Sequence, residues 1–501
     1  MNNRYSGKIR KVMTFALAAS LTVGLLAGCS SAGKVKDSKE EKVLRIGMLY
    51  GSNDDSWFRQ QYTDIYEFNN NVRIEIVPAV DQSEYRYRDY SNNEQYVEPD
   101  YFEGMKKLMT GNNPVDIIIA DTGTLKRLAE ENLLKPLDPM IQEDKFDTSD
   151  IVPVVIDTLK DIGGDNKLYG LSPTFSSSAL FYNKKVFADA GIEPPTDGMT
   201  WDEVFDKARM VSKGEGKDRV FGFSFNRYLG SDPYWDMQSS YVTPLELRVY
   251  DEKAELMTVN SPQWQKVWDT ISKLAKDKTI PSSANMNMEE YYSEDNYSPI
   301  SGDLFLSGKL AMMISDGYYI NEIVEANNNA DKIKNYSPVD WDIVTMPVHP
   351  EKPGIGSNIW IGNTFSINSA APNAETAWDF IKFVNGEDFA KLRSRSNSYE
   401  MVSRKSFITP KAGQSYNIDA FYQLKPVPPA SAAEEKLARD IPGLYNITNS
   451  GRPHFQEVLE DKKSVADALK EWEEKGNKML LELKKNPKAQ FNEDGSVFEM
   501  H

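Results

Sequence analysis

Cysteine and histidine are scarce in this chain. Its single cysteine, Cys29, excludes an intrachain disulfide. Its three histidines lie far apart, at positions 349, 454 and 501, and no spacing typical of metal ligands is present, so the sequence predicts no metal site and no cofactor. Sequences typical of a nucleophile elbow or a phosphate-binding loop are also missing, so we expect no catalytic residues.

Positive charge is in deficit as well. The chain has 58 lysines and arginines against 75 acids, which gives a formal net charge of −17. A nucleic-acid-binding surface needs a basic face, so this balance excludes nucleic acid as a partner. Aromatic residues, by contrast, are plentiful, with 25 tyrosines and 9 tryptophans. Sugar C–H faces stack on rings while sugar hydroxyls need polar partners, so rings among polar residues suit a carbohydrate, although most of these rings are expected in cores.

The N-terminus has the parts of a secretory signal. A basic start precedes the apolar run Val12–Leu26, which is too short and wrongly flanked to span a membrane. We expect residues 1–28 to be a signal peptide, whose removal would take the net charge from −17 to −21 because it carries four basic residues and no acid. Residues 29–42 are small, polar and charged, which predicts a flexible tether.

The end of the apolar run, Leu26-Ala27-Gly28-Cys29, resembles the lipobox of bacterial lipoproteins. The resemblance implies that Cys29 is lipidated and that the lipid anchors a folded domain to the outer face of the cell membrane without spanning it. An ordinary cleaved signal followed by an unmodified cysteine is the alternative.

Residues 302–320 predict a helix end, a tight turn, a buried strand and the start of a new helix. Gly308 is expected at the turn in a left-handed conformation, and Leu310–Ile314 is an apolar run of strand length. Asp316 and Tyr318 follow this run. Ligands of open α/β sheets bind outside the carboxyl ends of strands, so both residues are candidate ligand contacts. An ordinary core unit of helix and strand would give the same pattern.

Strands and helices alternate in the first part of the chain. Val43–Tyr50, Val72–Val77 and Val115–Ala120 are predicted strands separated by helical segments, which favours an α/β fold with a parallel sheet. Asp121 follows the third strand at its carboxyl end and is a further candidate contact. The polar, tyrosine-rich residues 81–100 have no predicted structure.

Several aromatic residues lie where a ring could face a ligand. Trp57 is at a predicted helix start, Tyr234 and Trp235 are in a polar loop, and Trp360 is among small and polar residues.

Together these segments resemble the extracellular solute-binding proteins of bacterial ABC sugar importers, the family that includes maltose-binding protein. The order and spacing of the matching segments over roughly residues 43–390 carry the resemblance, whereas residues 81–100 and 386–450 depart from the short members. The matching segments after the lipobox are Leu168–Pro173, Leu180–Phe187, Ala190–Pro195 with the capping box Thr200-Trp201-Asp202-Glu203, Leu304–Met312 and Ala377–Ile381.

The resemblance implies a two-lobed periplasmic-binding-protein fold of type II, with a mainly parallel sheet flanked by helices in each lobe and a hinge between the lobes. Lobe one would contain residues 43–173 and 315–365, and lobe two residues 174–314 and 366–501. A monomeric protein would capture a saccharide in the interlobe cleft and deliver it to an ABC transporter permease. The implied ligand contacts are Asp54, Trp57, Asp121, Phe175, Tyr234, Trp235, Asp316, Tyr318 and Trp360.

Two other interpretations stay open at this point. A secreted polysaccharide-degrading enzyme would use the same aromatic residues with a pair of carboxylates, such as Glu289-Glu290 or Asp54-Asp55. A lipoprotein that binds peptides, or that senses a solute, would share the fold but not the ligand.

Overall fold

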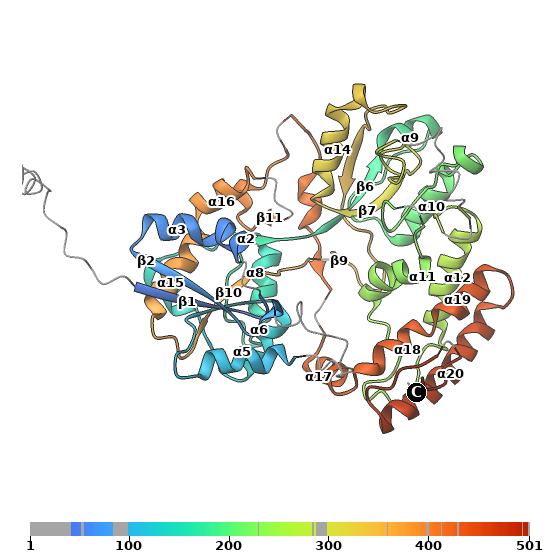
Figure 1. Cartoon of the computed structure of the whole chain (residues 1–501). Coiled ribbons are helices and arrows are strands. Elements are labelled where there is room, and N and C mark those ends of the chain that lie inside the picture. The colour runs from blue at the N-terminus through green and yellow to red at the C-terminus, as the bar shows by residue number, and fades with distance from the viewer. Residues whose placement is uncertain are drawn as a thin grey trace, which may run out of the picture. The chain divides into compact units, whose positions relative to one another are not determined.

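The computed structural model describes residues 42–51, 55–83, 99–228, 230–282, 285–286, 298–357, 359–396, 400–411, 413–427, 430–492 and 494–498 (Figure 1). The predicted signal peptide, Cys29, Asp54, the Glu289-Glu290 pair and most of the tyrosine-rich insertion lie outside these residues. Among the described residues, 42–44 and 55–75 form one compact unit, and the others form a second, larger unit.

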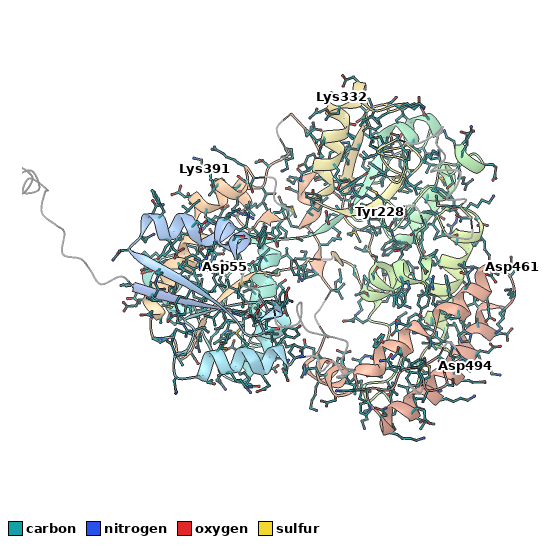
Figure 2. The ribbon with its side chains drawn as sticks, in the orientation of Figure 1. Asp55, Tyr228, Lys332, Lys391, Asp461 and Asp494 are labelled. Carbon is teal, nitrogen blue, oxygen red and sulfur yellow. The ribbon has the colours of Figure 1, made fainter. Side chains whose placement is uncertain are left out.

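The small unit is built on one helical run followed by a strand. The run consists of α2 (Ser56–Phe58), the π-helical turn η1 (Arg59–Thr63) and α3 (Asp64–Asn69), and the unit also holds most of β2 (Val72–Pro78). The Arg59 guanidinium lies 2.9 Å from Asp55 Oδ2 and 3.3 Å from Glu67 Oε2, and it donates to the Ile74 carbonyl at 3.2 Å. These interactions connect the helical run to β2. Figure 2 labels the Asp55 side chain.

The larger unit contains two main sheets. In the first, the strands run in the order β1-β3-β10-β4. Strand β3 is an uninterrupted buried Ile-Ile-Ile-Ala segment that pairs in parallel with β1, whereas β10 runs antiparallel to both β3 and β4. The bounds are β1 (Lys42–Met48), β3 (Ile117–Ala120), β4 (Leu134–Lys135) and β10 (Thr364–Asn368).

Helices accompany the strands of the first sheet. Helix α15 packs against β10 and α6 contacts β4. The bounds are α5 (Tyr101–Thr110), α6 (Thr122–Glu130), α7 (Asp138–Asp144), α8 (Pro153–Lys160), α15 (Ala374–Val384) and α16 (Glu387–Arg393).

The second sheet has β6 (Ser178–Asn183) at its centre, between β7 (Met312–Asp316) and β8 (Trp341–Val344). Both outer strands run antiparallel to β6. The expectation of a mainly parallel sheet in each lobe is therefore wrong for this sheet. A buried apolar run shows that a strand is internal but does not show the direction of its neighbours.

The pairing of β7 and β8 with β6 also differs from the predicted division of the chain. Residues 315–365 were expected with the first sheet, but α14 (Tyr319–Asn328) and β8 belong with the second. Conversely, α15 belongs with the first sheet although it follows residue 366. Strand partners are chosen by packing across long separations, which local sequence does not report.

The predicted turn before β7 is confirmed at Gly308, whose φ is 70°. The expected helix end at residues 304–306 is replaced by consecutive turns. In these turns the Asp303 carboxylate accepts hydrogen bonds from the amides of Phe305 and Leu306 at 3.0 and 2.9 Å, and from the Tyr319 hydroxyl.

The largest buried cluster lies on one side of the second sheet and is rich in aromatic rings. It joins α10, α12 and the C-terminal helices, and the Trp268 ring stacks on the Trp472 ring with centroids 5.5 Å apart. The bounds on this side are α9 (Lys184–Ala190), α10 (Trp201–Val211), α11 (Pro233–Asp236), η4 (Met237–Val242), α12 (Pro262–Lys276), α17 (Ala432–Asp440), α18 (Tyr445–Asn449), α19 (Arg452–Leu459) and α20 (Val465–Lys485).

Two short strand pairs complete the larger unit. Strand β5 (Thr174–Phe175) pairs antiparallel with β11 (Met401–Val402), and β9 (Ile355–Ser357) pairs in parallel with β12 (Lys425–Pro426). Across the part of the chain that the structure describes, every helix is too short or too polar to cross a membrane.

Candidate functional site

The main candidate site is a cavity of 510 Å³ at the start of α6. Strand β3 ends at Ala120, and Thr122 and Gly123 in the first turn of α6 line the cavity. The cavity therefore lies beyond the carboxyl end of a buried strand, where α/β sheets bind their ligands. Its volume is in the range of about 300–1,000 Å³ that is typical of small-molecule sites.

The other walls come from α8 and from the β9–β12 pair. Helix α8 contacts β12, so these walls support each other. The apolar lining is Val154, Ile162, Ile355, Ile359, Pro426 and Val427, and the charged lining is Lys126, Lys160, Lys425, Asp157 and Asp161. The cavity thus offers an apolar surface with ionic groups of both signs, and lysines outnumber carboxylates in a chain that is acidic overall.

Asp121 is held at the edge of this cavity by its role as the cap of α6. Its carboxylate accepts hydrogen bonds from the Thr124 amide at 2.9 Å and from the Thr124 hydroxyl at 3.0 Å. The cap satisfies free amides of the first helical turn and keeps the carboxylate near Gly123. Asp121 is therefore structural at least in part, and it directly precedes the lining residue Thr122.

A second carboxylate near α6 belongs to Glu435 of α17. A Cβ placed on Gly123 would lie 3.2 Å from both Asp121 Oδ1 and Glu435 Oε1. Burial raises the pKa of Glu435 and the Asp121 charge adds to this rise, while Arg439, Lys126 and Arg127 oppose it. Glu435 was not predictable from the sequence, because nothing local connects α17 with α6.

Trp360 directly follows Ile359, which is one of the residues that line the cavity. Its amide and carbonyl both bond to the Ser176 backbone at 2.9 Å, which fixes the main chain. The indole is 57% exposed, and a Cβ at Gly362 would lie 1.9 Å from its Cη2 atom. The ring therefore lies directly over Gly362, where only a glycine leaves room for it.

None of the predicted contacts that the structure describes, Asp121 and Trp360 included, is itself among the residues that line this cavity. Trp235 on α11 is 40% exposed, and Asp316 at the end of β7 is exposed and accepts a hydrogen bond from the Tyr318 amide at 3.0 Å. Trp57, in the small unit, is 61% exposed.

Two of the predicted contacts are core residues in the structure. Tyr234 is 1% exposed, and its hydroxyl donates to the Thr448 carbonyl. Phe175 is fully buried and lies in β5. These two predictions are therefore corrected: a polar neighbourhood in the sequence does not reveal which of two adjacent rings, such as Tyr234 and Trp235, turns inward.

A second cavity, of 80 Å³, lies beside Gly317, between Asp316 and Tyr318 in the chain. Its lining is mainly apolar, with Ile320 and Phe421, and includes the Arg393 side chain. It has room for water molecules but is too small for a saccharide.

Asp236, next to Trp235 on α11, has a raised pKa. Burial raises its pKa from 3.8 to about 6, although it accepts hydrogen bonds from Ser231 and from Asn226, the latter at 3.0 Å. Below pH 4 the carboxyl is protonated both folded and unfolded. Between pH 4 and pH 6 the unfolded chain releases this proton first, so the free energy of unfolding falls as the pH rises through this window.

We expect Asp236→Asn to abolish the fall in the free energy of unfolding between pH 4 and pH 6, because an amide does not titrate. A pKa raised by two units corresponds to about 3 kcal/mol, and the amide can keep both hydrogen bonds, so we expect a gain of about 2 kcal/mol at pH 7. Urea denaturation at pH 4, 5, 6 and 7 measures the effect. Asp269→Asn, at an exposed position of α12, is the matched control. If the free energies of unfolding of the parent and of Asp236→Asn differ by the same amount at all four pH values, the raised pKa of Asp236 is contradicted.

Comparisons with known proteins agree with this architecture. The family model described as bacterial extracellular solute-binding protein matches residues 93–391. The sn-glycerol-3-phosphate-binding periplasmic protein UgpB of Brucella melitensis is 22% identical over 382 residues, which cover 73% of this chain and 79% of the relative.

Two solved structures share the fold. A sugar transporter from Rhizobium etli, in an open conformation, matches with a TM-score of 0.57 and 18% identity, over 87% of this chain and 99% of its own. An ABC substrate-binding protein from Listeria monocytogenes in complex with cycloalternan matches with a TM-score of 0.51 and 20% identity, over 88% of this chain and 99% of its own. These likenesses show the two-lobed binding-protein fold, and the proteins concerned are binding proteins rather than enzymes.

Proposed function

Because the chain belongs to the bacterial extracellular solute-binding protein family and acts outside the cytoplasm as a binding component of ABC importers, we propose that its solute is a sugar or oligosaccharide. The protein would capture the saccharide in the cleft of its two-lobed fold and deliver it, as a monomer, to a membrane permease. Ligand-biased closure of the lobes would mark the loaded state for the permease.

The observation that carries this proposal is the 510 Å³ cavity at the carboxyl end of β3. Its apolar wall suits the C–H faces of a sugar ring, and its lysines, aspartates and threonines suit the hydroxyls. The exposed ring of Trp360, adjacent in the chain to Ile359 of the lining, supplies a stacking surface beside the cavity. Asp121, Trp235, Asp316, Tyr318 and Trp57 are the further proposed contacts.

We also propose that a lipid on Cys29 anchors the protein at the outer face of the cell membrane, with residues 30–42 as the tether. Growth of cells with labelled palmitate tests this part: the parent protein should carry the label and Cys29→Ala should not. A parent protein without label, or a Cys29→Ala variant that carries as much label as the parent, would contradict lipidation of Cys29.

A second candidate ligand is a phosphorylated polyol or sugar. Lys126, Lys160 and Lys425 all line the cavity, and ammonium groups bind phosphate as point charges. The relative from Brucella melitensis is named for binding sn-glycerol 3-phosphate. The ligands that we would test therefore include phosphorylated compounds as well as neutral saccharides.

We expect one class of saccharide to raise the unfolding temperature of the purified protein. A ligand that binds only the folded chain stabilises it by about 2.7 kcal/mol at a hundredfold excess over Kd. The panel contains neutral mono- and oligosaccharides, uronic acids, glycerol 3-phosphate, sugar phosphates and short peptides, and each mixture is analysed afterwards for unchanged ligand. A shift with peptides and none with any sugar or phosphate would overturn the carbohydrate proposal while leaving the family intact.

A further inference from the structure

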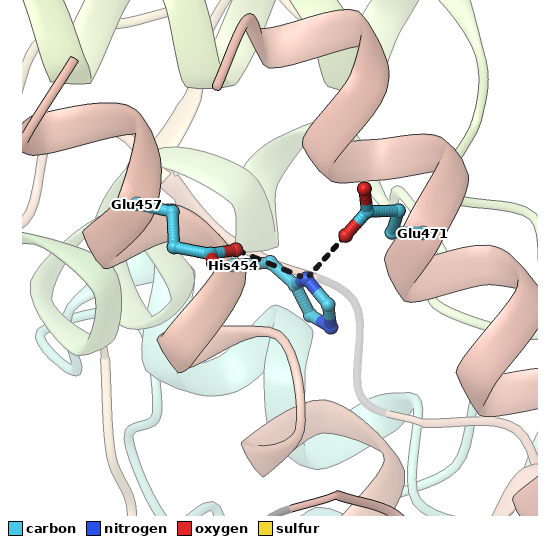
Figure 3. Close-up of side chains that lie close together, drawn as sticks. All are labelled: His454, Glu457 and Glu471. Atoms are coloured by element: carbon cyan, nitrogen blue, oxygen red, sulfur yellow. Dashed lines mark ion pairs between the residues drawn. The ribbon is translucent and has the colours of Figure 1, made fainter. Parts of the chain in front are cut away.

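Three side chains with metal-ligating atoms meet between the two C-terminal helices. His454 and Glu457 are three residues apart on α19, which places them on the same helical face. Glu471 comes from the neighbouring helix α20. Figure 3 shows the two carboxylates directed at the same imidazole nitrogen from opposite sides.

The spacing of the three groups suits a small cation. His454 Nδ1 lies 3.7 Å from Glu457 Oε2 and 3.9 Å from Glu471 Oε2, and one ligand atom from each residue lies within 4.8 Å of the others. Zn²⁺ bonds to imidazole nitrogen and carboxylate oxygen at about 2.0–2.2 Å in tetrahedral geometry, which places ligand atoms about 3.4 Å apart. Small side-chain rotations would therefore close the set around an ion.

The imidazole of His454 is mostly buried, with a side chain only 13% exposed, and neither ring nitrogen has a hydrogen-bond partner among the described residues. Burial lowers the pKa of His454, and the nearby Lys475 and Lys463 lower it further, against the opposing charges of Glu457 and Glu471. The neutral ring keeps a lone pair, which is the form that ligates a metal.

Lys463 shows that this position already stabilises a cation. Its ammonium lies 2.8 Å from Glu457 Oε2 and also bonds to Glu471, so it joins the same two carboxylates. The side chain is 26% exposed and follows α19 in the chain, so it could swing into solvent. A metal ion and the Lys463 ammonium would therefore compete for the same oxygens.

The core beneath the cluster fixes the two helices. Phe455 and Trp472, the chain neighbours of His454 and Glu471, are buried and both pack against Trp268 of α12. Ligands on such supported helices keep their spacing when the ion binds.

We propose that His454, Glu457 and Glu471 form a Zn²⁺ site that links α19 to α20, with water as the fourth ligand and Lys463 as an internal competitor. The imidazole favours Zn²⁺ over Ca²⁺ and Mg²⁺, which prefer sites made of oxygen alone. This site uses none of the residues that line the solute cavity and does not depend on the identity of the solute.

Zinc titration of the whole protein without a histidine tag tests the proposal. Calorimetry should give one Zn²⁺ per chain, and Co²⁺ should produce the visible absorption of a tetrahedral site. His454→Gln and Glu471→Gln should each weaken binding roughly tenfold or more, because each removes one of three protein ligands. Glu474→Gln, on the exposed face of the same helix α20, is the matched control and should bind as the parent does.

Lys463→Met gives the decisive comparison, because we expect it to strengthen Zn²⁺ binding whereas His454→Gln and Glu471→Gln weaken it. Removal of the competing ammonium should tighten Zn²⁺ binding roughly tenfold, which a merely structural ion pair would not do. Circular dichroism spectra show whether each variant is folded. The proposal is overturned if neither the parent nor Lys463→Met binds Zn²⁺, if binding is indifferent to His454→Gln and Glu471→Gln, or if Ca²⁺ binds as tightly as Zn²⁺.

Discussion

Replacement of Trp268 by alanine should lower the free energy of unfolding by about 3–5 kcal/mol. The indole is fully buried in α12 and stacks on Trp472 with ring centroids 5.5 Å apart and planes inclined by 17°. It also contacts the Phe455 ring at 5.0 Å. Truncation would remove contacts with two other helices at once and leave a cavity that the rigid surrounding rings cannot fill.

Urea denaturation of the two single variants Trp268→Ala and Trp360→Ala, measured side by side, isolates the effect of burial on the free energy of unfolding. Both variants lose the same atoms, but the Trp360 ring is 57% exposed. We expect Trp360→Ala to change the free energy of unfolding by less than about 1 kcal/mol. Equal losses in the two variants would show that the aromatic cluster around Trp268 does not hold the C-terminal helices in place.

Trp360→Ala should instead weaken saccharide binding by about 2–4 kcal/mol, a loss of roughly 30-fold or more in affinity. This expectation rests on the proposed function. The exposed residue directly follows Ile359 of the cavity lining, has its backbone fixed by two hydrogen bonds to Ser176, and has its ring packed against Gly362. A ring that is already in place loses little entropy when a sugar stacks on it.

Gly362→Ala is the matching second variant. The new methyl group would lie within 1.9 Å of the present position of the Trp360 ring and would force it to move while leaving the indole intact. We expect an affinity between those of the parent and Trp360→Ala, measured by calorimetry with the saccharide that stabilises the parent. If both variants bind as the parent does, the saccharide does not stack on Trp360, and Trp235→Ala becomes the next variant to measure.

Features set by a few neighbouring residues were predictable from the sequence. The capping box of Thr200 and Glu203 is confirmed at the start of α10, because both partners lie within one helical turn. The left-handed turn at Gly308 is also confirmed, because glycine adopts a positive φ at less cost than other residues, although the helix expected before it is absent.

The candidate residues of the site show where such reasoning stops. Trp235 and Tyr234 are adjacent, yet the first is partly exposed and the second belongs to the core with its hydroxyl bonded to Thr448, more than two hundred residues away in the chain. Glu435 approaches Gly123 from a distant helix. In the proposed zinc site, the sequence predicted no metal ligands, because the spacing of His454 and Glu457 is not by itself typical of a metal site and the arrival of Glu471 depends on how α20 packs on α19.

The sequence by itself determined the α/β class, the local caps and turns, and the membership of a binding-protein family, because these depend on residue types and spacings within short segments. Tertiary structure decided that β7 and β8 both run antiparallel to β6, that Tyr234 and Phe175 are core residues, and which groups line the cavity at α6. Strand direction, the inward or outward turn of a ring and the meeting of distant charges all depend on packing between segments far apart in the chain. The free energy of those contacts exists only once the segments are together.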